Sequence, residues 1–113
     1  MAVQKRSLLF NVNQTNDDIK QLIKRRRRQI MVHSAIYYRL GTSVITDAQF
    51  DKWARELVKL QNDYPNESKQ VELYEDFKDW DASSGFNLNF YPFLRLAQYL
   101  VKLCEGKNEY QEI

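Results

Sequence analysis

The sequence predicts a mainly α-helical protein with one small domain. Only 3 Gly and 2 Pro occur among 113 residues, so the chain has few places for tight turns. Apolar residues recur at three- and four-residue spacing over residues 16–40 and 47–63, which indicates a helical hairpin. With 43% hydrophobic residues, a chain of this length can bury a modest core without disulfides or metal ions. We expect further helices after the hairpin.

The first helix of the hairpin is preceded by a segment that the sequence leaves undecided. Residues 1–14 contain "SLLFNV", which predicts either a short strand or an ordered arm. We expect the single helical domain to cover residues 15–113. Thr15 or Asn16 can cap the first helix, and Gly41 is placed to end it.

The second helix has clearer boundaries. Thr46 and Gln49 form a T-x-x-Q capping box, and the residue before Pro65 is disfavoured in a helix. Trp53 lies on the apolar face, and we expect it to be largely buried between the two helices.

Two C-terminal helices follow from the same periodicity. "SKQVELYEDFKDW", residues 68–80, predicts a short third helix, and "DASSGFNLN" predicts a loop. "FYPFLRLAQYLVKLCEGK", residues 90–107, predicts a fourth helix with Pro92 in its first turn and Gly106 as its end.

Several classes of protein are disfavoured by composition. One cysteine, Cys104, excludes a disulfide framework and a zinc site with several cysteines. The single His33 has no Asp or Glu one helical turn away, so we expect no metal site. No apolar run approaches the roughly 20 residues that span a bilayer, and no signal-peptide pattern occurs at the N-terminus. We therefore expect a cytoplasmic protein without a membrane partner.

Charge is distributed unevenly along the chain. Residues 1–40 hold nine Lys/Arg and two Asp/Glu, a charge of +7, whereas residues 41–113 carry −5. Five consecutive cations cover all sides of a helix, so some must point outward: Lys24, Arg25, Arg26, Arg27 and Arg28. This arginine run either balances the acidic segment "ELYEDFKDWD" or contacts DNA or RNA phosphates or an acidic protein surface.

Polar and aromatic residues converge around the turn of the hairpin. His33, Tyr37 and Tyr38 stand near the end of the first helix, and Asp47-Ala48-Gln49-Phe50-Asp51 opens the second, which ends in "LVKLQNDYP". This helix-turn-helix block, residues 33–65, resembles the N-terminal domain of NAD-dependent bacterial DNA ligases, a small helical module that binds the nicotinamide mononucleotide (NMN) half of NAD.

The resemblance implies a role for each of these residues. Tyr37 and Tyr38 would present their rings and hydroxyls to the nicotinamide, and Asp47 and Asp51 would bond to the ribose or the carboxamide, with His33 as a supporting residue. A pyridinium ring is a flat cation, which aromatic faces and carboxylates both attract. From the residues alone, the alternative is that the tyrosines pack the helix junction and the aspartates complement the helix dipole.

The chain also departs from the ligase pattern. Phe50 replaces the family's tyrosine, so a hydroxyl that could bond phosphate is missing, and Gly41-Thr42-Ser43 replaces an Asp-x-Pro turn. No K-x-D-G motif occurs, so the nucleophilic lysine of an adenylating enzyme is absent from the sequence. We therefore expect that the protein is not an enzyme.

Three functions remain open from the sequence. The first, which the sequence favours, is a phage-encoded binding protein that acts by contact on a protein or nucleoprotein of its bacterial host. Inhibition of a host nucleic-acid enzyme, including an anti-CRISPR role, belongs in this class. The second is a module that binds NMN or NAD through the helix-turn-helix block. The third is binding to nucleic acid through the arginine run.

Overall fold

The computed structural model describes residues 12–108, with side chains described for residues 16–105, and all regular elements in this range are helices. They are α1 (Val12–Arg39), α2 (Asp47–Asp63), α3 (Pro65–Lys69), α4 (Tyr74–Phe77), the 3₁₀ helix η1 (Tyr91–Phe93) and α5 (Leu94–Asn108). The predicted mainly helical fold is therefore confirmed. The N-terminal strand or arm lies, over residues 1–11, outside the described part of the chain. Residues 12–14 are already helical, so the predicted caps at Thr15 and Asn16 are wrong.

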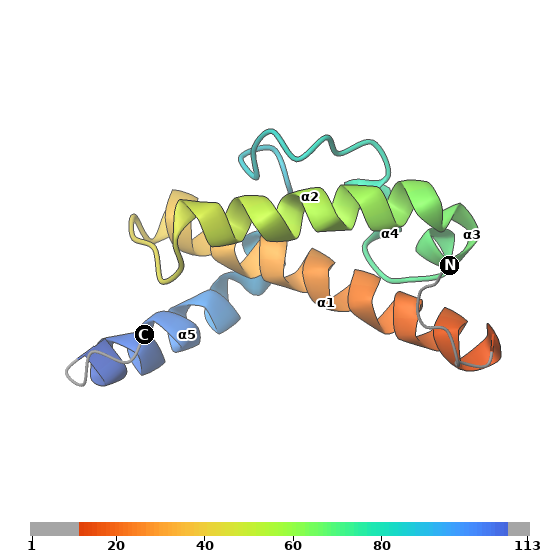
Figure 1. Ribbon diagram of the computed structural model, residues 1–113. Coiled ribbons are helices and arrows are strands. Elements are labelled where there is room, and N and C mark those ends of the chain that lie inside the picture. The colour runs from red at the N-terminus through yellow and green to blue at the C-terminus, as the bar shows by residue number, and fades with distance from the viewer. Residues whose placement is uncertain (1–11, 109–113) are drawn as a thin grey trace.

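The helical hairpin forms as the sequence predicts. α1 and α2 run side by side in opposite directions, and α5 diverges from them at an angle (Figure 1). α1 ends at Arg39, and Gly41 adopts a φ of 68°, a left-handed conformation that suits a glycine after a helix. Thr46 caps α2, because its hydroxyl accepts a hydrogen bond of 3.0 Å from the backbone N–H of Gln49.

The core lies where α1 contacts α2, α5 and the short helices. Its fully enclosed side chains come mainly from one stripe of α1, together with residues of α2, α4 and α5: Ile23, Ile30, Met31, Ala35, Ala54, Leu57, Phe77 and Ala97. Trp53 is half-buried at the edge of this core, so the prediction that it is largely buried is only partly right. Its ring centroid lies 5.6 Å from that of His33.

The segment after α2 differs from the expected third helix. Residues 68–80 are not one helix, because α3 and α4 are separated by a turn in which Leu73 has a φ of 70°. An L-residue in the left-handed region interrupts a right-handed helix, and the apolar spacing of this segment does not reveal that turn. The predicted loop before η1 is confirmed. α5 continues two residues beyond Gly106, which therefore does not end it.

Between residues 12 and 108, no helix is both long enough and apolar enough to cross a bilayer.

Candidate functional site

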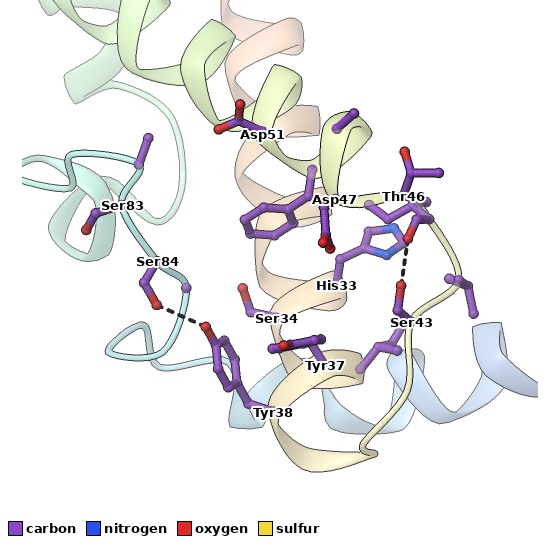
Figure 2. A pocket seen from close by; sticks show the side chains of 17 residues that line it. His33, Ser34, Tyr37, Tyr38, Ser43, Thr46, Asp47, Asp51, Ser83 and Ser84 are labelled. Atoms are coloured by element: carbon purple, nitrogen blue, oxygen red, sulfur yellow. Dashed lines mark hydrogen bonds between the residues drawn. The ribbon is translucent and has the colours of Figure 1, made fainter.

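A cavity of about 480 Å³ opens beside the turn of the hairpin. Its walls come from the last turns of α1, the connection 43–46, the first turns of α2 and the loop segment 82–85 (Figure 2). This volume lies within the range of roughly 300–1,000 Å³ that is typical of small-molecule sites.

All six predicted nucleotide-binding residues line this one cavity. His33, Tyr37 and Tyr38 come from α1, and Asp47, Phe50 and Asp51 come from α2. The antiparallel hairpin explains this convergence, because it brings the end of α1 to the start of α2. The structure thus places the six residues together.

The two tyrosines have different surroundings. The side chain of Tyr37 is 59% exposed, and its ring meets that of Tyr38 edge-on at 4.9 Å. Tyr38 packs against Phe86 and Phe90, at 5.3 and 6.1 Å between ring centroids, and its hydroxyl lies 3.0 Å from that of Ser84. Tyr37 is therefore accessible from the cavity, whereas Tyr38 also joins α1 to the loop.

The carboxylates stand on the opposite wall. Asp47 is exposed in the first turn of α2, and Asp51 follows one turn later on the same side. Asp51 pairs with Arg55, whose Nη2 lies 2.5 Å from the Asp51 Oδ2. Carboxylate oxygens at these positions can accept hydrogen bonds from hydroxyl or amide groups of a ligand.

Among the side chains that the structure describes, two buried polar atoms lack a hydrogen-bond partner. They are Nδ1 of His33 and Oγ of Ser34, and both residues line the cavity. Burial lowers the pKa of His33 to about 4, so its imidazole is neutral at pH 7. Since buried polar groups are nearly always hydrogen-bonded, these two atoms are suited to partners that a ligand would bring.

The loop segment 82–85 forms a wall that the sequence did not predict. The Trp80 indole N–H donates a 2.7 Å hydrogen bond to the Ser84 carbonyl, and the Ser83 N–H donates one of 2.9 Å to Asp81. Gly85 is buried directly against Ser34. The composition of "DASSGFNLN" indicates a loop, but no sequence pattern assigns it to the hairpin turn.

The lining of the cavity contains no fixed positive charge. Its 17 residues include Asp47 and Asp51 but neither lysine nor arginine, and His33 is neutral. This distribution favours a cationic or neutral group over an anion. Among the described residues, no group of three or more His, Cys, Asp or Glu side chains could hold a metal ion.

The arginine run is divided between the interior and the surface of the protein. Arg27 is fully buried, and its guanidinium donates hydrogen bonds to Gln61, to Ser68, and to the carbonyls of Val71 and Glu72 at 2.6–3.2 Å. Burial lowers the pKa of Arg27 to about 10, which still leaves it charged at pH 7. Arg27 therefore holds α3 and the following turn against α1, and it is not available for phosphate.

The other four cations are divided between internal pairs and the surface. Arg26 pairs with Glu56 of α2 at 3.0 Å, and the exposed Arg28 pairs with Glu72 at 2.9 Å. Lys24 and Arg25 are exposed, and within the described part of the chain neither makes an ion pair. The predicted match to the acidic segment thus holds for Arg28, whereas Arg26 pairs with α2 instead. A contact surface is reduced to the exposed members of the run.

Comparison with known proteins identifies the hairpin. Residues 16–70 match the family model described as DNA ligase-like, N-terminal NAD⁺-binding domain. This part of the chain is thus similar to the Ia domain of DNA ligases. It contains all six predicted nucleotide-binding residues, and it ends before the loop segment 82–85.

Two DNA ligases are similar to the same region. The DNA ligase of Pseudothermotoga lettingae is 37% identical over 49 residues, which are 43% of this chain and 7% of that protein. The DNA ligase of Fervidobacterium nodosum is 36% identical over 50 residues, which are 44% of this chain and 7% of that protein. The match therefore spans only a small fraction of the ligases' length. No solved structure matches the chain.

Proposed function

We propose that the ligase Ia-like domain of this protein binds the nicotinamide nucleotide end of NAD⁺, as NMN or as the whole dinucleotide, in the cavity beside the hairpin turn. The observation that carries this proposal is the convergence of His33, Tyr37, Tyr38, Asp47, Phe50 and Asp51 on one cavity within the segment that matches an NAD⁺-binding family.

The chemistry of the cavity suits a pyridinium nucleoside. The cationic ring would lie on the exposed face of Tyr37, and the two carboxylates would add electrostatic attraction. The carboxylates of Asp47 and Asp51 can accept hydrogen bonds from the ribose hydroxyls and from the carboxamide N–H₂ group. The unpartnered atoms of His33 and Ser34 would receive their missing hydrogen bonds from the same ligand.

The proposed role is binding without chemistry. The sequence contains no K-x-D-G motif, so we propose that this chain alone does not take up AMP from NAD⁺. Incubation with radiolabelled NAD⁺ should leave the protein unlabelled, and covalent labelling would contradict this part of the proposal.

Calorimetric titration of the folded protein with NMN tests the binding. We expect a dissociation constant on the order of micromolar to millimolar, and Asp47→Ala should abolish the heat signal. Lys52→Gln, an exposed change on the same helix outside the cavity, is the matched control and should bind like wild type. A folded protein that gives no heat with millimolar NMN would refute the proposal.

Of the other two functions that the sequence left open, one is not proposed and one stays a prediction. Neither the fold nor the relatives, which are DNA ligases, supply support for a phage-encoded inhibitor of a host enzyme, and we do not propose that role. Contact with DNA or RNA phosphates or with an acidic protein stays a prediction for Lys24, Arg25 and Arg28, the exposed residues of the arginine run.

A further inference from the structure

A second hollow of about 310 Å³ lies further along α2, next to the cavity. Side chains of α2 line it together with two residues of the loop after α4: Arg55, Val58, Lys59, Asn62, Asp63, Asp81 and Ala82. Ala82 borders both spaces, so the same loop segment walls the cavity and the hollow. In Figure 1 this loop runs along α2.

The two spaces differ in charge. The cavity has two carboxylates and no lysine or arginine, whereas the hollow combines the cations Arg55 and Lys59 with the carboxylates Asp63 and Asp81. Among the residues that line the two spaces, only those of the hollow include a lysine or arginine that could bind the phosphate of a ligand whose cationic ring lies in the cavity. The phosphate finds no cation among the cavity residues, and Phe50 offers it no hydroxyl.

Arg55 stands at the boundary between the two spaces. Its guanidinium reaches back to Asp51, a residue of the cavity, about 6 Å nearer the start of the helix. A guanidinium has five N–H donors, and the contact with Asp51 involves one terminal nitrogen, so donors remain for an anion. The side chain of Arg55 is 77% exposed and thus accessible.

Lys59 is less suited to this role. Its ammonium already donates a 2.8 Å hydrogen bond to Asp63, one turn further along α2. It also lies another helical turn away from the cavity.

We propose that the hollow at Arg55 is a phosphate subsite, continuous with the nicotinamide cavity, in which the Arg55 guanidinium binds the phosphate of the nucleotide. This inference rests on the proposed function. It predicts that the site distinguishes nicotinamide mononucleotide from nicotinamide riboside, which has the same ring and sugar but no phosphate.

Calorimetry with these two ligands, at low ionic strength and with the full chain, tests the subsite. Wild type should bind NMN about three- to ten-fold more tightly than the riboside, because the guanidinium contact is charged but largely exposed. Arg55→Gln should remove this difference by weakening NMN binding and leaving riboside binding nearly unchanged. Lys52→Gln removes the same charge from an exposed position of α2 outside both spaces, and it should preserve the difference.

The possible failures are distinguishable. If wild type binds both ligands equally, or if Arg55→Gln weakens both by the same factor, the subsite is refuted while nicotinamide binding stands. Equal weakening would mean that Arg55 acts only through its pair with Asp51. If neither ligand binds the folded wild-type protein, the proposed function itself is refuted, and the subsite with it.

Discussion

Gly85 lies so close to Ser34 that a β-carbon at position 85 would stand 2.0 Å from the serine Oγ and 2.9 Å from its Cβ. Both residues are buried, and they join the loop after α4 to the C-terminal part of α1. This close approach sets the position of one wall of the cavity.

Gly85→Ala should therefore move the loop away from α1. We expect a loss of about 1–3 kcal/mol in the free energy of unfolding, because the side chain of Ser34 is enclosed and cannot easily move aside. Adding Ser34→Ala removes the closest atom and should restore part of the loss in chemical denaturation. Ser83→Ala, an exposed change in the same loop, is the control. Unchanged stability of Gly85→Ala would contradict the close packing.

Arg27 provides a second test of the fold. Arg27→Met should cost about 3 kcal/mol or more, because it leaves several carbonyl groups beside α3 without their donor. Arg27→Lys should also destabilise, since an ammonium cannot reproduce the forked set of hydrogen bonds. Arg25→Gln, two residues away and exposed, should stay within about 0.5 kcal/mol. Equal effects at positions 25 and 27 in urea unfolding would contradict this account.

His33 should make stability depend on pH in a defined direction. Its pKa is about 4 in the folded protein, against 6.5 ordinarily, so the unfolded state binds more protons between these values. The free energy of unfolding should fall as the pH drops from 6.5 towards 4. We expect protonation of His33 to account for about 1–2 kcal/mol of this fall in the free energy of unfolding, after allowance for its partial exposure.

Comparison of wild type with His33→Gln isolates this effect. Between pH 6.5 and 5, where most carboxylates stay ionised, the variant should lose less stability than wild type. Parallel curves of melting temperature against pH would show that the imidazole is not buried in its neutral form.

The two tyrosines of the cavity should respond differently to mutation. Tyr37→Ala should leave the melting temperature nearly unchanged and weaken NMN binding about ten-fold, because the ring is exposed and offers its face to the ligand. Tyr37→Phe should keep most of the affinity.

Tyr38→Phe should instead affect the loop. Loss of the hydroxyl contact with Ser84 should cost about 0.5–1.5 kcal/mol in thermal unfolding. If Tyr37→Ala unfolded the protein while Tyr38→Phe had no effect on stability, the assigned roles would be reversed.

Local signals in the sequence predicted the turn of the hairpin, whereas the six candidate site residues were assigned from the resemblance to DNA ligases. The T-x-x-Q box and Gly41 define the hairpin turn, and the turn alone brings Tyr37 of α1 near Asp47 of α2. These features act over a few residues, so periodicity and capping rules detect them.

Features that depend on distant contacts were missed. The turn at Leu73 comes directly after Val71 and Glu72, whose carbonyl groups accept hydrogen bonds from Arg27. Arg27 belongs to α1 and precedes these residues by more than 40 positions. Within a charge run, no local pattern indicates that the third arginine is buried. The placement of the loop at Gly85 likewise depends on its contact with Ser34, which sequence spacing does not encode.

The most direct test of nicotinamide nucleotide binding in the cavity is a two-dimensional ¹H–¹⁵N NMR titration of the folded protein with NMN. The account predicts saturable shift changes at the amides of Tyr37 and Asp47 and at Gly85 in the loop, with little change at Lys24 and Arg25, far from the cavity along α1. Absence of shifts at millimolar NMN, or shifts centred on the arginine run while the cavity amides stay still, would contradict it.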